Sequence, residues 1–209
     1  IPRDVPISED APRQPCNPYG RTKLAMEQAL ADYACAYGWG VAALRYFNAA
    51  GAASDGTLGE DHSPESHLIP LVLQVALRQR EAITVFGNDY PTPDGTCVRD
   101  YIHVDDLATA HALALDQLQA GNVLKLNLGT GRGYSVQQVI DTCRKVTGHD
   151  IPLQTGQRRA GAPPELVADP ARAFETLDWR PEASSLSSIV ETAWNWHRSH
   201  PEGYASPRV

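Results

Sequence analysis

The sequence predicts an α/β fold organised around a parallel sheet. Short apolar runs typical of strands, such as 41–47, 123–128 and 151–154, alternate with longer segments that have helical periodicity. Hydrophobic residues make up 42% of the 209 residues, and no apolar run reaches the roughly 18 residues that a membrane span requires. We therefore expect a globular chain with no membrane segment, no internal repeat and no low-complexity region.

The first helix has the clearest boundaries. Asn17 is a suitable N-cap and Pro18 suits the first helical position, while the Gly38-Trp39-Gly40 run ends the helix. Its apolar and small residues recur at helical spacing, which predicts one buried face. These residues are Leu24, Ala25, Ala29, Leu30, Tyr33, Ala34 and Tyr37.

The remaining elements follow in order. The strand 41–47 delivers Asn48, and a glycine-rich loop over 49–67 is long enough to suggest a function. Asp105 or Asp106 is expected to cap a helix that ends near Gln119, and Ser135 to cap another. Further helices are predicted at 68–80, 135–146, from Asp169-Pro170 onward and at 186–198, and further strands at 83–86, 98–104, 123–128 and 151–154.

Charge and cysteine content exclude several classes of protein. The formal charge of −7 argues against a nucleic acid or an anionic membrane as partner. Cys16, Cys35, Cys97 and Cys143 have no paired spacing, so we expect reduced thiols and a cytoplasmic location, and the charged, proline-broken start is unlike a signal peptide. His103 and His111 lack a third ligand nearby in sequence, so no metal site is expected.

Tyr19 and Lys23 are the most informative pair in the chain. Residues four apart share one face of a helix, so the ammonium can lie beside the phenol. A nearby cation favours a phenolate over a phenol, which makes a tyrosine usable as a proton acceptor. A surface tyrosine beside a solvated lysine would give the same spacing, so the pair requires support from other motifs.

A glycine-rich turn at 129–133 resembles a nucleotide-binding turn but fits one poorly. The third glycine of a dinucleotide fingerprint would fall at Tyr134, where a side chain blocks close packing of helix and strand. We therefore predict a structural strand-to-helix turn with Ser135 as N-cap.

Four motifs in this order resemble the UDP-glucose 4-epimerase family of the extended short-chain dehydrogenase/reductase superfamily. They are Asn17-Pro18-Tyr19-Gly20-Arg21-Thr22-Lys23, Leu44–Gly51, Phe86–Thr96 and Val98–Leu107, and the resemblance runs from about Pro15 to Tyr204. It implies a Rossmann-like extended short-chain dehydrogenase fold. Residues 1–50 would be the last part of an NAD-binding domain, and 51–209 mainly a UDP-sugar domain, with 98–119 returning to the NAD-binding sheet.

The resemblance also implies a segment that these residues lack. In this family a dinucleotide-binding half of roughly 100 residues or more, a domain's worth, precedes the Tyr-x-x-x-Lys helix. It carries a glycine-rich phosphate turn and a Ser/Thr that bonds the substrate hydroxyl, and the only methionine here is Met26. We therefore expect a C-terminal portion that has no activity alone and that is a homodimer in its full-length form.

The implied activity is the NAD-dependent interconversion of UDP-glucose and UDP-galactose in galactose metabolism, through transient oxidation at the sugar C4. Tyr19 would be the catalytic base and Lys23 its partner, and Tyr46 and Phe47 would lie near NAD. The resemblance assigns the UDP-hexose to a larger set. Its members are Asn48, His67, Leu68, Thr84, Val85, Phe86, Arg99, Tyr101, Arg159 and Leu166.

Two positions depart from the family pattern or bear on its specificity. Ala162 stands where the family has an acidic residue that contacts the uridine ribose, which should weaken UDP binding. Leu166 matches the position that controls the size of the sugar pocket. Leucine is intermediate in size, so the sequence does not decide whether N-acetylated or pentose UDP-sugars are accepted. Two alternatives also remain: another nucleotide-sugar epimerase or dehydratase of the superfamily, and an inactive UDP-sugar-binding chain.

Overall fold

The computed structural model describes residues 2, 4–159 and 161–204, so Ile1, Arg3, Ala160 and 205–209 lie outside it. Helices and strands alternate over much of the chain. The helices are α1 (Pro18–Tyr37), α2 (Leu68–Ala76), α3 (Val104–Asp116), α4 (Val136–Thr147), α5 (Ala171–Leu177) and α6 (Leu186–Ser199). The strands are β1 (Val41–Tyr46), β2 (Asn48–Ala50), β3 (Ile83–Phe86), β4 (Val98–His103), β5 (Val123–Leu128), β6 (Gly133–Ser135), β7 (Leu153–Gly156) and β8 (Glu165–Leu166).

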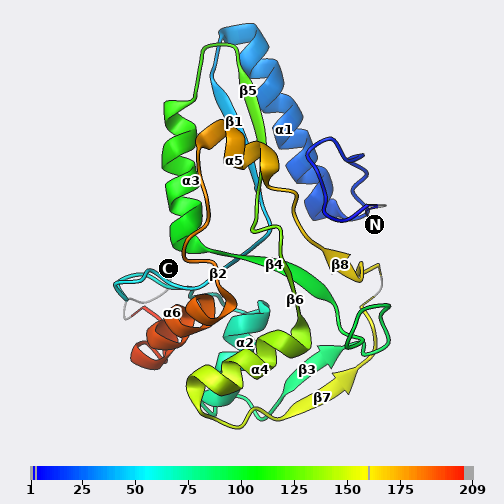
Figure 1. Cartoon of the computed structure of the whole chain (residues 1–209), viewed down its shortest axis with the longest axis vertical. Helices are drawn as coiled ribbons and strands as arrows, with labels where there is room; N and C mark the ends of the chain where they lie inside the picture. Colours follow the sequence, from blue (N-terminus) through cyan, green and yellow to red (C-terminus); the bar gives the residue numbers. More distant parts are fainter. Residues whose placement is uncertain (1, 3, 160, 205–209) are drawn as a thin grey trace.

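The strands form three groups that are mostly parallel. β1 pairs with β5 and β3 pairs with β7, both parallel, while β4 pairs with β2 and β8 in parallel and with β6 antiparallel. Figure 1 shows the β1–β5 pair with α1, α3 and α5 at one end of the elongated molecule. Helices α2, α4 and α6 lie with β3 and β7 at the other end, and β4 runs between the two.

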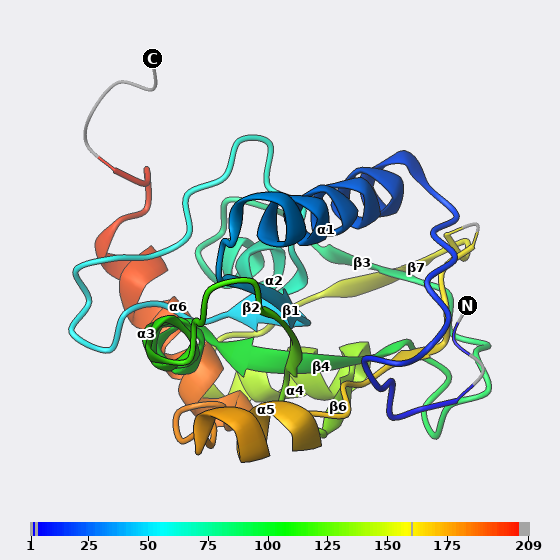
Figure 2. The ribbon, with the colours of Figure 1, turned by 90° about the horizontal axis from the view of Figure 1, so that it is seen from above.

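Each end of the molecule has its own core. Ile102, Leu126, Leu128 and Trp179 are buried where α3 and α5 meet the β1–β5 pair. The second core packs α2, α4 and α6 against β3 and β4. Figure 2 shows α1 on one side of β1 and α5 on the other.

Helix α1 begins and ends as predicted, but its apolar face is not buried. Asn17 accepts a hydrogen bond from the Gly20 backbone N–H, and Gly38 closes the helix in the left-handed conformation. Ala34 is the buried residue of the helix, whereas Tyr33 and Tyr37 are exposed. The helix is joined to β1 by the Glu27 carboxylate, which accepts hydrogen bonds from the Arg45 guanidinium, and most of its apolar residues are exposed. The predicted buried face is therefore wrong for most of its members.

Several element boundaries also differ from the prediction. The helix predicted at 68–80 ends at Ala76, because Arg78 adopts a left-handed backbone that cannot continue a helix. Ala49 and Ala50, expected to begin a loop, join Asn48 in β2 because β4 supplies a partner strand. The strand expected at 151–154 is shifted to β7, and β6 and β8 were not predicted.

The predicted cap of α3 is wrong. His103 is the N-cap, and its Nδ1 accepts a hydrogen bond from the Asp105 backbone N–H. Asp106 instead accepts hydrogen bonds from the backbone N–H groups of Glu182 and Ala183 and from the Ser184 hydroxyl. The buried carboxylate thus joins α3 to the segment before α6.

Among the residues that the structure describes, no helix is long and apolar enough to cross a membrane.

Candidate functional site

A cavity of about 250 Å³ lies at the junction of β2, β3, β4 and the first turn of α2. Arg159, Ala162 and residues of α6 complete its wall. It gathers most of the residues that the resemblance assigned to the substrate. These are Asn48, His67, Leu68, Thr84, Val85, Phe86, Arg99, Tyr101 and Arg159.

Strand pairing brings these residues together from distant parts of the sequence. Asn48 is the register partner of Tyr101, because β2 and β4 are parallel neighbours. β3 supplies Thr84 and Phe86 from the other side of the cavity. Helix α2 is apolar and buries Ile69 and Leu73 in the core. This packing holds the N-terminus of α2 at the cavity wall.

The arginines near the cavity are engaged differently. Arg158 forms an ion pair with Asp89 (2.5 Å) and lies over the Tyr90 ring. The Arg159 guanidinium lies 4.4 Å from the centre of the Phe86 ring, and no ion pair engages it within the described part of the chain. Arg159 is therefore the cation available to an anionic ligand.

Arg99 has structural bonds as well as a place on the cavity wall. Its guanidinium donates to the carbonyls of Val98 (2.7 Å) and Pro163 (3.0 Å). It therefore holds the loop after Arg159 against β4. Binding of a ligand to Arg99 would compete with these carbonyl contacts.

Two buried tyrosines lie on the cavity wall. Burial raises the pKa of Tyr101, so this phenol stays protonated at neutral pH. The neighbouring Cys97 thiol and burial also raise the pKa of Tyr90. Among the described residues, the Tyr90 hydroxyl and the Trp179 indole N–H are the buried side-chain groups without a hydrogen-bond partner. The Tyr90 hydroxyl is thus a protonated group that is buried at the cavity wall without a hydrogen-bond partner among the described residues.

Tyr19 and Lys23 lie outside this cavity lining. The Lys23 Nζ is 5.3 Å from the centre of the Tyr19 ring, so the predicted proximity is present, and Tyr19 is 70% exposed. The exposed Tyr46 ends β1 and contacts the ring of His111, and the half-buried Phe47 donates its N–H to the Leu128 carbonyl. Because β1 follows α1 and runs back antiparallel to it, the first turn of α1, which contains Tyr19, lies toward the end of β1, where Tyr46 stands.

Ala162 and Leu166 occupy different places. Ala162 lines the cavity, as expected for a residue near a bound nucleotide. Leu166 is not among the lining residues; it lies in β8 as the register partner of Arg99. Its control of the sugar pocket therefore stays a prediction.

The glycine-rich turn after β5 is occupied by a carboxylate of the chain itself. The buried Asp100 accepts hydrogen bonds from the backbone N–H groups of Thr130 (3.0 Å), Gly131 (3.0 Å) and Ala168 (3.2 Å), and from the Thr130 hydroxyl (2.7 Å). Burial raises the pKa of Asp100, although these donors oppose the shift. Ser135 caps α4 with a complete capping box. The predicted structural turn is confirmed.

The sequence analysis missed several wall residues, including Glu60, Tyr90, Cys97, Trp196 and His197. Tyr90 lies inside the Phe86–Thr96 motif, and attention to the aromatic residue in that turn could have identified it. Trp196 and His197 come from α6, far along the chain. No local pattern places them beside β2, so only the folded structure identifies them.

Comparison with known proteins agrees with this geometry. The model of the family described as "NAD dependent epimerase/dehydratase family" matches residues 2–129. A UDP-glucose 4-epimerase of Halalkalibacterium halodurans is 54% identical over 206 residues, which cover 98% of this chain and 62% of that protein. The chain thus spans about three-fifths of the length of the curated relatives it matches.

Solved structures of similar proteins have the same fold. The UDP-glucose 4-epimerase of Bifidobacterium longum, in complex with NAD+ and UDP, matches with a TM-score of 0.91 and 41% identity; the match covers 97% of this chain and 61% of that one. The enzyme of Brucella ovis, in complex with NAD, matches with a TM-score of 0.88 and 51% identity and covers 93% and 60% of the two chains. The predicted α/β class, with the Rossmann-like extended short-chain dehydrogenase fold, is confirmed.

Proposed function

The chain belongs to the NAD-dependent epimerase/dehydratase family, and on this premise we propose that it is part of a UDP-glucose 4-epimerase. The whole protein would interconvert UDP-glucose and UDP-galactose by transient oxidation at the sugar C4. The observation that carries the proposal is the cavity in which Asn48, Phe86 and Arg159 meet although they are far apart in sequence. High identity to UDP-glucose 4-epimerases supports the choice of reaction.

The chemistry of the cavity suits a nucleoside diphosphate sugar. Arg159 offers a planar cation that can bind diphosphate oxygens at two points. Thr84, Val85 and Phe86 present a strand edge and an aromatic ring on which a uracil can lie. Binding energy would concentrate on the nucleotide, which leaves the hexose free to present either face at C4.

The residues present also fit one side of an NAD site. Neither the Tyr19 hydroxyl nor the Lys23 ammonium forms a hydrogen bond with the described residues, and both face solvent at the start of α1. Phenol and ammonium donors suit the hydroxyls of a nicotinamide ribose, and Tyr46 and Phe47 would border the ring. When bound, NAD would supply an acceptor for the hydride of the sugar C4, and the same hydride would later return to C4.

The chain's own part in the reaction is proton transfer at the sugar 4-OH. We propose that Tyr19 accepts the 4-OH proton and returns it to the product, with Lys23 stabilising the phenolate by its positive charge. Asn48, His67 and Leu68 would orient the sugar and diphosphate, and Arg99 and Tyr101 would border the nucleotide. Leu166 would control the space available to the sugar.

The domain assignment and the homodimer are proposals as well. Residues 1–50 would complete the NAD-binding domain, and 51–209 would bind mainly the substrate, with 98–119 packing back on the first part. Contacts of α3 with β1 support that return. The exposed Tyr33, Tyr37 and Trp39 at the end of α1 would suit contact with a second copy.

Binding of UDP to the 209-residue chain tests the cavity without requiring catalysis. Isothermal titration calorimetry should show 1:1 binding that Arg159→Ala weakens by roughly 10- to 100-fold, the expected effect of removing a charged hydrogen-bond donor. Arg158→Ala is the matched control, because Arg158 is already paired with Asp89. Equal losses in both variants, or no UDP binding by the wild-type chain, would reject the assignment.

Turnover distinguishes the remaining alternatives. A full-length form that retains NAD through purification and epimerises UDP-galactose supports the proposal. Retained NAD with dehydration or decarboxylation instead would indicate another member of the superfamily. UDP binding without NAD or turnover in the full-length form would indicate a binding protein.

A further inference from the structure

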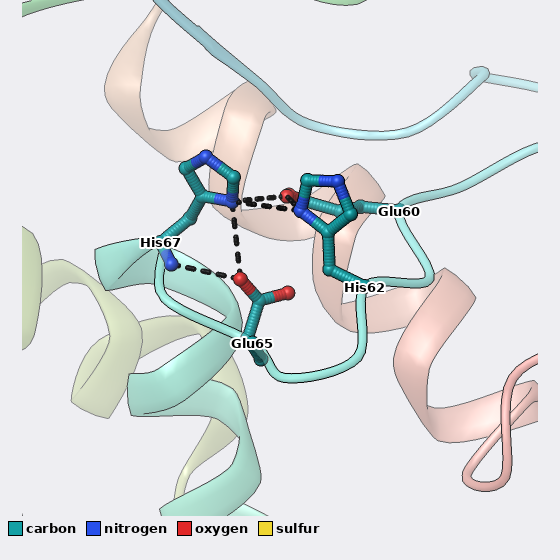
Figure 3. A group of neighbouring side chains, drawn as sticks. All are labelled: Glu60, His62, Glu65 and His67. Carbon is teal, nitrogen blue, oxygen red and sulfur yellow. Dashed lines mark hydrogen bonds and ion pairs between the residues drawn. The ribbon is translucent and has the colours of Figure 1, made fainter. Parts of the chain in front are cut away.

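Four ligand-type side chains converge on the loop that precedes α2. Glu60, His62, Glu65 and His67 each offer one atom, and these atoms all lie within 4.8 Å of one another. Figure 3 shows the side chains directed toward a common point, with His67 at the start of α2. Their spacing in sequence, Glu-x-His-x-x-Glu-x-His, places all four on a single loop.

Hydrogen bonding alone satisfies this arrangement poorly. The His67 Nδ1 lies 2.6 Å from a Glu60 oxygen, 3.0 Å from a Glu65 oxygen and 3.3 Å from the His62 Nδ1. The His67 Nδ1 carries at most one proton, so it cannot donate a full hydrogen bond to both carboxylates. Two carboxylates and two imidazole Nδ1 atoms therefore share one small region, where a cation can replace the shared proton.

We infer that Glu60, His62, Glu65 and His67 form a binding site for a divalent transition-metal ion of the zinc class. A tetrahedral zinc ion with bonds of roughly 2.0–2.1 Å keeps its ligand atoms about 3.3–3.4 Å apart. The separations are 2.6, 3.0, 3.3 and 3.5 Å for four of the pairs and at most 4.8 Å for the others, so the side chains would have to adjust their positions around an ion to complete the site. Mixed imidazole and carboxylate ligands favour this class over magnesium or calcium.

The surroundings of the cluster support a bound cation. Glu65 accepts hydrogen bonds from the backbone N–H groups of Ser66 and His67, which fix its carboxylate, and its side chain is 7% exposed. A divalent ion would remove the electrostatic repulsion between the neighbouring Glu60 and Glu65 carboxylates.

The ion would have a structural effect on the neighbouring cavity. Glu60 and His67 also line the cavity, so the metal would fix the loop 60–67 at its edge and hold the N-terminus of α2. The inference concerns a structural ion and does not depend on the proposed epimerase activity. It predicts greater resistance of this loop to proteolysis in the metal-bound chain.

The test is calorimetric titration of the chelator-treated 209-residue chain with ZnCl₂ in the absence of UDP. Both exposed thiols are first removed by Cys16→Ser and Cys35→Ser, because thiolates bind zinc elsewhere. We expect one equivalent to bind, and His62→Gln to weaken binding at least tenfold. His62 does not line the cavity. The matched control, His149→Gln, removes an exposed histidine outside the cluster and should leave zinc affinity unchanged.

Co²⁺ spectroscopy provides a second readout if His62→Gln fails to fold. Four-coordinate Co²⁺ gives intense visible bands, whereas six-coordinate Co²⁺ bound through water gives weak ones. Intense bands that ZnCl₂ abolishes support the site. Absence of binding, weak bands, or equal zinc affinity in the His62 and His149 variants would overturn the inference, whatever the result of the UDP titration.

Discussion

Replacement of Asp100 tests how the centre of the molecule is held together. Asp100 is buried and joins three segments: β4, the turn at 129–131 and the segment that follows β8. Its Oδ2 accepts the N–H groups of Gly131 and Ala168, and its Oδ1 accepts the Thr130 hydroxyl. Both neighbours of Asp100 in sequence, Arg99 and Tyr101, lie on the cavity wall.

The magnitude follows from the number of donors left unpaired. Hydrogen bonds to a charged group contribute about 1.5–3 kcal/mol each, and a buried unpaired donor costs about 1–3 kcal/mol. In Asp100→Asn the amide oxygen can still accept from Gly131 and Ala168 while the NH₂ group faces the Thr130 hydroxyl. We therefore expect a loss of about 1–3 kcal/mol in the free energy of unfolding. Asp100→Ala removes every acceptor and should cost about 3–5 kcal/mol.

Urea unfolding at pH 7.5, followed by circular dichroism, measures the difference from the shift in midpoint at constant slope. Asp116→Asn is the control: Asp116 is exposed at the end of α3, so its replacement should change stability by less than about 0.5 kcal/mol. Asp100→Asn and Asp100→Ala variants that match Asp116→Asn would refute the reasoning that Asp100 holds the turn. Unfolding with a changed slope would mean that the denatured or native state itself had changed.

Three further predictions concern binding, pH and catalysis. Ala162→Asp, on the cavity wall, should strengthen UDP binding about fivefold, which corresponds to about 1 kcal/mol, by restoring an acceptor for a ribose hydroxyl. Calorimetry measures the affinity, and Ala162→Asn is the control that separates the hydrogen bond from the effect of the added charge. Burial lowers the pKa of His103, so the unfolded chain takes up a proton at a higher pH than the folded chain does. The free energy of unfolding should therefore be at its maximum above about pH 6.5 and decrease below that pH by up to ~1.4 kcal/mol per pH unit. His103→Gln should flatten this slope in urea titrations, and an unchanged slope would contradict the assignment. Tyr19→Phe in a full-length form should lower kcat by about 10²–10⁴ without weakening UDP binding, whereas turnover by the 209-residue chain alone would contradict the need for a dinucleotide-binding half.

Local signals in the sequence were enough for most elements. Asn17 and Gly38 bound α1, and Ser135 caps α4, because each works through hydrogen bonds within a few residues of itself. The run 123–128 matches β5 residue for residue. The prediction failed where a partner strand or a distant donor intervened, as at β2 and at Asp106.

By itself, the sequence determined the α/β class, the order of the elements and the family. These depend on local propensity, on periodicity and on ordered motifs that can be read along the chain. The tertiary structure alone decided that Arg159, among the described residues, has no ion-pair partner while Arg158 pairs with Asp89, that the aromatic end of α1 faces outward, and that His197 joins the cavity wall. The physical reason is that burial, ion pairing and the walls of a cavity depend on the register between strands and helices far apart in sequence, and no local pattern encodes that register.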